Sequence, residues 1–93
     1  MDIRFYLDPD TGQPHIYGHG VAENEVREVL QRPGDDFPAA KNSRMKLGQT
    51  LAGRYLQVIY APNEKGDGVF VITAYELKGN AKKAYRRRKR RKP

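Results

Sequence analysis

The sequence predicts a small α+β domain in which helices pack against one small antiparallel sheet. Three observations predict this class. Apolar residues recur at helical spacing over residues 21–31. Three segments rich in β-branched and aromatic residues follow one another between residues 44 and 75, and a strongly basic segment ends the chain. Ninety-three residues suit one domain, so residues 1–81 are expected to form its compact part and residues 82–93 its basic C-terminal helix or tail.

The N-terminal part is expected to hold one strand and one helix. Residues 3–7 (IRFYL) form a short apolar run that predicts the first strand, and residues 8–12 (DPDTG) have turn chemistry. Residues 14–19 suit either a short helix or irregular structure. Residues 21–31 predict the clearest helix of the chain, because one face carries its apolar residues, Ala22, Val26, Val29 and Leu30.

The second half predicts a three-stranded antiparallel meander followed by a helix. Residues 35–43 show no period and are expected to form a loop. The expected strands cover 44–50, 55–61 and 69–75, and their short polar connections favour hairpins. Asn80 is a suitable N-cap for a terminal helix. The narrow packing face of that helix would consist of Ala81, Ala84, Tyr85 and Arg88.

The net charge of +7 is unevenly distributed along the chain. Residues 82–92 carry nine Lys and Arg and no acid, whereas residues 1–81 carry a net charge of −2. This asymmetry is typical of a segment that binds a polyanion, with RNA, DNA and anionic lipid as candidates, or of a solvated tail that serves solubility. The predicted nucleic-acid-binding residues are Lys82, Lys83, Arg86, Arg87, Arg88, Lys89, Arg90 and Arg91.

Composition excludes several other classes of protein. The chain has no cysteine, which removes disulfide frameworks, zinc ribbons and thiol catalysis. His15 and His19 lack an evident third metal ligand, so we expect neither a metal nor a small-molecule cofactor. No apolar run approaches the roughly 20 residues that span a membrane, and the N-terminus does not read as a signal peptide. A cytoplasmic location without membrane contact is therefore expected.

Three short motifs resemble a known family. They are HGV at residues 19–21 before an acidic amphipathic helix, GRYLQVIY at residues 53–60, and VITAY at residues 71–75 before a basic helix. Together they resemble the BrnT-type toxins of bacterial toxin–antitoxin pairs and the related DUF4258-type proteins, within the wider RelE/ParE-like group. Tyr75 stands where the strand of that family usually ends in Ala-Arg.

The resemblance implies a RelE-like α+β fold and an activity on RNA. A BrnT-like toxin would cleave mRNA, with ribosome-bound mRNA as one form of the target, or otherwise inhibit translation, and a partner antitoxin would neutralise it. The matched positions are His19, Arg44, Lys46 and Arg54, with Tyr75 at the strand end. Because Tyr75 replaces a cation, the alternative is a nucleic-acid-binding or regulatory module without catalysis on the same fold.

The residue inventory allows metal-independent RNA cleavage. Attack by a 2′-hydroxyl needs a base, an acid and cations that stabilise the phosphate. The candidate catalytic residues are His19, Arg44, Lys46, Arg54, Tyr75 and Glu76. Structural roles are open for five of them, all but Glu76. Tyr75 would be a core aromatic with a polar tip. His19 would pack at a helix entry, Arg54 would bond loop carbonyls, and the cations at 44 and 46 would be solvated on an outward sheet face.

Overall fold

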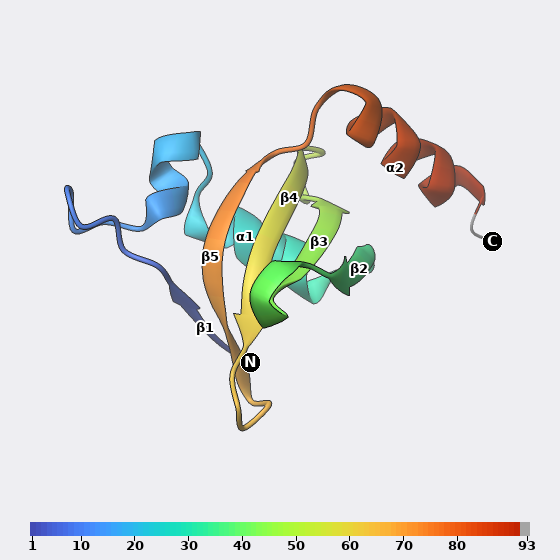
Figure 1. Cartoon of the computed structure of the whole chain (residues 1–93). Helices are drawn as coiled ribbons and strands as arrows, with labels where there is room; N and C mark the ends of the chain where they lie inside the picture. Colours follow the sequence, from blue (N-terminus) through green and yellow to red (C-terminus); the bar gives the residue numbers. More distant parts are fainter. Residues whose placement is uncertain (92–93) are drawn as a thin grey trace.

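The computed structural model describes the backbone of residues 1–91 and the side chains of residues 1–90. It contains a five-stranded sheet in the order β1-β5-β4-β3-β2, with one helix on each face (Figure 1). The elements are β1 (Asp2–Phe5), the 3-10 helix η1 (His15–His19), α1 (Glu23–Gln31), β2 (Asp35–Pro38), the 3-10 turn η2 (Ala40–Asn42), β3 (Arg44–Gln49), β4 (Tyr55–Pro62), β5 (Gly68–Glu76) and α2 (Gly79–Arg91). The predicted α+β class is confirmed.

The sheet is larger than the predicted three-stranded meander and is mixed. The antiparallel order β3-β4-β5 is confirmed. Two further strands extend it: β1 pairs parallel to β5, and β2 pairs antiparallel to β3. The expectation of a loop over residues 35–43 is therefore wrong for its first part. Residue 36 anchors β2, because the Asp36 carboxylate accepts a hydrogen bond from Arg44 Nε at 2.9 Å.

The parallel pairing of β1 with β5 depends on a glycine. A Cβ atom at Gly68 would lie 2.4 Å from the carbonyl oxygen of Asp2, so only glycine permits this approach of the two backbones. The Asp2 N–H donates to the carbonyl of Asp67 at 3.1 Å, and the Tyr6 N–H donates to that of Val71 at 2.9 Å. These bonds hold both ends of β1 against β5.

The main core lies between α1 and the sheet. The α1 helix starts where the Ala22 N–H donates to Glu25 Oε1 at 3.0 Å, and its Val26 and Val29 side chains are fully buried. A Cβ atom at Gly48 would lie 3.0 Å from Val29 Cγ1, so β3 runs directly beneath the helix. The buried residues of this core are Ile3, Ile16, Val21, Val26, Val29, Leu56, Val58, Tyr60, Val71 and Ala74.

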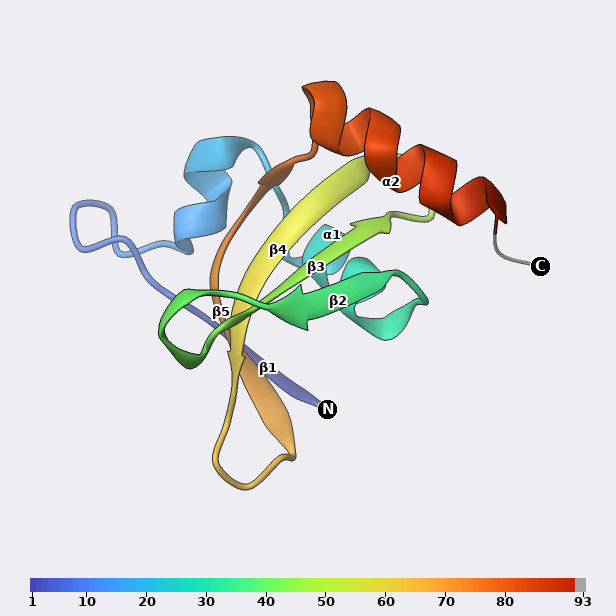
Figure 2. The same cartoon turned by 45° about the vertical axis from the view of Figure 1, so that its right-hand side comes forward.

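The α2 helix packs on the opposite face of the sheet, at one end (Figure 2). Tyr85 and Leu77 are buried there against Leu47. The predicted N-cap at Asn80 is wrong, because α2 begins at Gly79 and Asn80 therefore lies within the helix. Of the predicted packing face, Tyr85 is buried and Arg88 donates to Asp35 at 2.7 Å, whereas Ala81 is exposed.

The segment before α1 is helical, which resolves the alternatives left open for residues 14–19. It forms η1, and the chain leaves this helix through Gly20 in the left-handed conformation, with φ of 71°. Ile16 is almost fully buried and anchors η1 against the main core. This anchor places His19, the last residue of η1, beside β5.

Candidate functional site

A surface hollow of about 440 Å³ lies where η1, the start of β4 and the end of β5 meet. It brings together four of the six predicted catalytic residues and one cation that was not predicted. The lining residues are His19, Arg54, Tyr75, Glu76 and Lys78. Lys78 is absent from the predicted residues because it lies between the last expected strand and the terminal helix, although a cation directly before a basic helix is a usable signal.

Arg54 is held in place by three segments of the fold. Its backbone N–H donates to Thr50 Oγ1 at 3.0 Å, which fixes the turn before β4. Its Nη1 donates to the Gly20 carbonyl at 2.8 Å and to Glu25 Oε1 at 3.0 Å, and its Nε donates to Glu76 Oε1 at 3.3 Å. The expected structural role, bonding to loop carbonyls, is therefore confirmed, and two carboxylates offset the charge of the guanidinium.

His19 and Tyr75 form the part of the hollow that can transfer protons. Their ring centroids are 5.7 Å apart, and His19 is exposed. Gln57 Nε2 donates to the Tyr75 hydroxyl oxygen at 3.0 Å, which leaves the hydroxyl hydrogen free to be donated elsewhere. An imidazole, a phenol and the carboxylate of Glu76 thus share one small hollow with two cations, which is the inventory that acid–base chemistry on a phosphodiester needs.

Arg44 and Lys46 are placed away from this hollow. Both share one face of β3, as expected, but α1 covers that face and Lys46 is buried. The expectation of solvated cations is therefore wrong for Lys46, whereas the Arg44 side chain is 37% exposed and pairs with Asp36. Lys46 Nζ donates to the carbonyls of Leu30 at 3.1 Å and Arg32 at 2.5 Å, and burial lowers its pKa. Arg44 holds β2 through its bond to Asp36, and Lys46 holds the end of α1.

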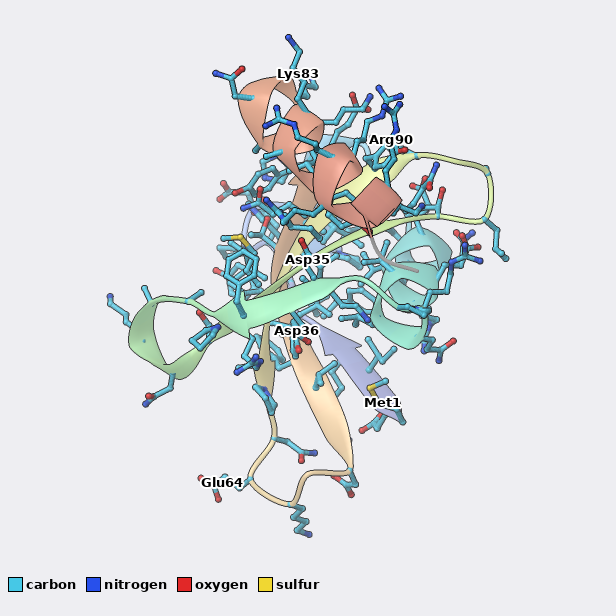
Figure 3. All side chains as sticks on the ribbon, turned by 90° about the vertical axis from the view of Figure 1, so that its right-hand side faces the viewer. Met1, Asp35, Asp36, Glu64, Lys83 and Arg90 are labelled. Atoms are coloured by element: carbon cyan, nitrogen blue, oxygen red, sulfur yellow. The ribbon has the colours of Figure 1, made fainter. Side chains whose placement is uncertain are left out.

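The exposed side of α2 carries most of the basic residues. Four of them, at helical spacing, surround a surface hollow of about 250 Å³: Lys83, Arg86, Arg87 and Arg90. Within residues 1–90, no ion pair is found for these four side chains. Figure 3 shows Lys83 and Arg90 on α2, far from Glu64 at the opposite end of the molecule.

The other predicted nucleic-acid-binding residues have contacts within the fold. Arg88 forms an ion pair with Asp35, and Lys89 donates to Gln49 Oε1. Lys82 Nζ lies 5.1 Å from the centre of the Tyr55 ring. The side chain of Arg91 lies outside the described residues. The predicted basic segment therefore divides into residues that face outward and residues held against the sheet. Arg86 has both properties, because it lines the outward hollow and its Cζ lies 5.9 Å from the centre of the Tyr55 ring.

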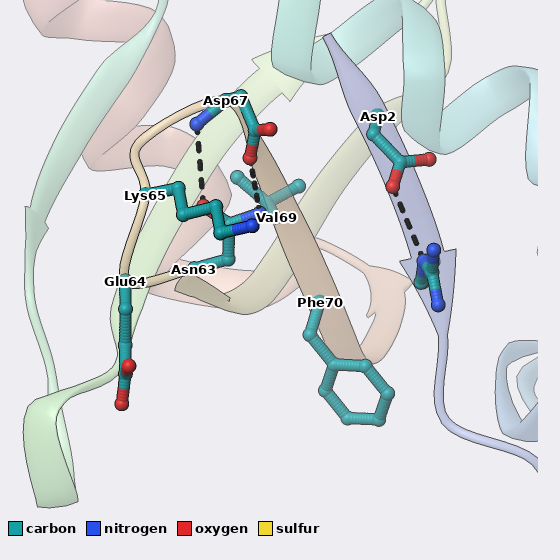
Figure 4. Close-up of a pocket in the computed structure, with 8 residues that line it drawn as sticks. Asp2, Asn63, Glu64, Lys65, Asp67, Val69 and Phe70 are labelled. Atoms are coloured by element: carbon teal, nitrogen blue, oxygen red, sulfur yellow. Dashed lines mark hydrogen bonds and ion pairs between the residues drawn. The ribbon is translucent and has the colours of Figure 1, made fainter.

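A second hollow, of about 450 Å³, lies beside the turn between β4 and β5 (Figure 4). Its lining includes Asp2 and Arg4 from β1 and Asn63 and Lys65 from the turn. Arg4 pairs with Asp2 at 3.1 Å, so charges of both signs neutralise one another there. Among the side chains of residues 1–90, none of the predicted site residues lines this hollow.

Comparison of the chain with protein-family models, with curated proteins and with solved structures finds no match. Across residues 1–91, none of the helices is both long and apolar enough to cross a membrane. In the same part of the chain, no three His, Cys, Asp or Glu side chains are grouped so that they could hold a metal ion. The function is therefore inferred from the geometry of the hollow and of α2.

Proposed function

We propose that this protein binds RNA through α2 and cleaves the bound strand at the His19 hollow, as a toxin of the BrnT-like, RelE-related type. The single observation that supports this most strongly is the row of outward cations on α2, Lys83, Arg86, Arg87 and Arg90, which line a shared hollow. A row of cations without ion pairs is suited to a chain of phosphates. This row lies on the helix that begins directly after Lys78, and Lys78 lines the His19 hollow.

The hollow supports a metal-independent reaction. The imidazole of His19 accepts the proton of a 2′-hydroxyl, and the oxygen that loses the proton attacks the adjacent phosphorus. Lys78 and Arg54 stabilise the negative charge that builds up on the phosphate. The Tyr75 hydroxyl donates its proton to the departing 5′-oxygen, and the products are a 2′,3′-cyclic phosphate and a free 5′-hydroxyl. RNA rather than DNA is the substrate, because only RNA carries the attacking hydroxyl.

A second candidate function is RNA binding without cleavage. It is favoured by the contacts of Arg54, whose Nη1 and Nε already donate to Glu25 and Glu76. A guanidinium occupied in this way has fewer N–H groups to offer a phosphate. In this case the protein would act as a regulatory module, and α2 alone would provide its activity.

The proposal includes a cellular context. A cytoplasmic protein of this type would act on mRNA, free or on the ribosome. An antitoxin from the adjacent gene would cover its basic surface. The expected sign of such a partner is an increase in elution mass when the two chains are produced together, together with loss of RNA binding.

The test of cleavage compares two tyrosine-to-phenylalanine variants. Cells that express the chain are examined for new RNA 5′ ends by primer extension, alongside cells expressing His19→Ala, Tyr75→Phe or Tyr17→Phe. Tyr17 is the matched control, because it is exposed and its hydroxyl donates to Glu23, outside the hollow. Discrete 5′ ends are expected for the wild-type chain and Tyr17→Phe, and none for His19→Ala or Tyr75→Phe.

The other outcomes separate the two candidates. Intact RNA in every sample, together with RNA binding by the purified chain, would exclude cleavage and support the second candidate, RNA binding without cleavage. Cleavage that persists in both His19→Ala and Tyr75→Phe would show that the hollow is not the reactive site. Failure of the purified chain to bind RNA would overturn both candidates.

A further inference from the structure

Four rings form a continuous row that leads into the catalytic hollow. The ring centroids of Tyr6 and His15 are 6.0 Å apart, those of His15 and His19 are 5.1 Å apart, and those of His19 and Tyr75 are 5.7 Å apart. The row begins just after β1, crosses η1 and ends on β5, where the last two rings line the hollow. Figure 1 shows η1 beside β5.

The backbone beneath the row is fixed by hydrogen bonds and by burial. The Tyr6 N–H donates to the carbonyl of Val71, and the His15 N–H donates to the carbonyl of Tyr6, both at 2.9 Å. Ile16 is 1% exposed and holds η1 in the main core. The rings therefore stand on a rigid surface before any ligand arrives, which reduces the entropy that binding would cost.

The row is accessible and is not basic. Tyr6 is 42% exposed, the His15 side chain is 37% exposed, and His19 is also exposed. Within residues 1–90, the charged group that contacts the row at this end is a carboxylate, since Asp8 Oδ2 lies 3.6 Å from His15 Nδ1. A carboxylate repels phosphate, so this surface is unsuited to a nucleic-acid backbone but is suited to uncharged, flat groups.

We propose that this ring row binds the unpaired bases of a single-stranded RNA. The inference rests on the proposed function and adds the class of substrate. Exposed aromatic rings stack on bases of any sequence, and paired bases inside a duplex do not present their faces. The strand would place its bases on the row and its reacting phosphate in the hollow, and its following phosphates would lie along α2. Cleavage would then fall in unpaired segments.

The experiment measures affinity for three probes of equal length. They are a fluorescently labelled single-stranded oligouridine, the same strand with abasic sites, and a base-paired RNA duplex. The variants are Tyr6→Ala and Tyr17→Ala, which remove a ring inside the row and an equally exposed ring outside it. We expect Tyr6→Ala to weaken oligouridine binding roughly tenfold. Tyr17→Ala should bind like the wild-type chain, and the abasic strand should bind both variants equally.

A second measurement does not depend on any substitution. The chain contains two histidines, and both lie in the row, so their imidazole NMR signals report on it directly. Oligouridine is expected to shift both signals, and the abasic strand is expected to leave the His15 signal unchanged.

The results that would overturn the inference are distinct from those that would overturn the proposed function. Equal affinity of Tyr6→Ala and the wild-type chain for oligouridine, or tighter binding of the duplex, would remove the row from RNA recognition. Arg87→Ala is measured with the same probes, and if it still weakened binding, α2 would keep its proposed role in RNA binding without the ring row. Absence of binding to all three probes would overturn both proposals.

Discussion

The ammonium group of Lys46 closes the C-terminal end of α1 by donating a hydrogen bond to the carbonyl oxygen of Leu30 at 3.1 Å. A second bond runs to the carbonyl of Arg32 at 2.5 Å. Carbonyls at the end of a helix lack partners within the helix, and a cation placed there also complements the helix dipole. Because Lys46 lies on β3, this contact fixes α1 against the sheet.

Replacing Lys46 by methionine is therefore expected to lower stability rather than to remove an RNA contact. Lys46→Met should reduce the free energy of unfolding by about 1–3 kcal/mol, because the helix-end carbonyls lose a buried donor. Urea denaturation measures this loss. Lys65→Met, which removes the same charge from the exposed turn before β5, should leave stability unchanged. If the Lys46→Met protein were as stable as the wild-type chain but no longer cleaved RNA, Lys46 would again be a candidate catalytic residue.

Stability is expected to fall at alkaline pH because of Tyr60. Its hydroxyl donates to the Asp36 carboxylate, and burial, followed by this bond, raises the pKa of Tyr60 to about 12. Its pKa in the unfolded chain is near 10. The folded state therefore keeps a proton that the unfolded state releases, so the contribution is complete below pH 10 and is lost as the pH rises toward 12.

The size of this loss is at most about 3 kcal/mol, because each pKa unit corresponds to about 1.4 kcal/mol, and urea unfolding across that pH range measures it. In a plot of unfolding free energy against pH, Tyr60→Phe should reduce the decline between pH 10 and 12, because it removes the ionising group. Tyr6→Phe, a change at an exposed ring, should retain the full decline. An undiminished decline in Tyr60→Phe would assign the effect to another group.

The sequence correctly predicted the helices and strands that can be recognised from neighbouring residues alone. The β-branched and aromatic content of residues 55–61 and the apolar spacing over 21–31 depend only on neighbouring residues, and both elements are present as β4 and α1. β2 was missed because the sequence DDFP has two acids, one proline and no alternation. Its pairing depends on Asp36 meeting Arg44, which is a contact between elements rather than a property of the segment.

The candidate site was predicted only in part, because its assembly also depends on contacts between elements. His19, Arg54, Tyr75 and Glu76 lie at the ends of elements, and the fold brings those ends together. Arg44 and Lys46 were placed on a common face of β3, and they share one. The strand pattern does not reveal which face a distant helix covers, so the burial of Lys46 against the end of α1 required the tertiary structure.

Arg54 and His19 are expected to differ in their effect on stability. Arg54 bonds Gly20, Glu25 and Glu76, so Arg54→Ala should cost about 1–3 kcal/mol of stability. His19 is exposed, and His19→Ala should change stability by less than about 0.5 kcal/mol. Arg54→Lys should not restore the loss, because an ammonium group cannot make the same set of directed bonds.

Thermal unfolding of the three proteins, beside their cleavage rates, checks this prediction. An Arg54→Ala protein as stable as the wild-type chain but without cleavage would mean that Arg54 acts on the phosphate and that its carboxylate contacts are dispensable for the fold.

Glycine at position 68 is expected to be required for β1. Gly68→Ala would place a methyl group 2.4 Å from the Asp2 carbonyl oxygen, so β1 should separate from β5 and the amides of β1 should lose protection from hydrogen exchange. Gly18→Ala is the control, because nothing lies within 4 Å of its added carbon. Retained protection of β1 in Gly68→Ala would show that the two strands can adjust their spacing.

Two adjacent arginines on α2 provide the sharpest test of the RNA-binding surface. Arg87 lines the outward hollow, whereas Arg88 forms an ion pair with Asp35 at 2.7 Å. Both substitutions, Arg87→Ala and Arg88→Ala, remove the same side chain. The salt dependence of binding counts the phosphates that a protein neutralises, so Arg87→Ala should lower the slope of log affinity against log salt by about one contact. Arg88→Ala should change this slope much less.

Fluorescence anisotropy with a single-stranded RNA over a series of salt concentrations measures both slopes. The comparison controls for residue type and for helix propensity, since the two positions are neighbours within α2. Equal losses of slope would mean that RNA competes with Asp35 for Arg88, so that the strand also reaches the sheet side of the helix. An unchanged slope in both variants would remove α2 from the contact surface, and the binding proposal would fail with it.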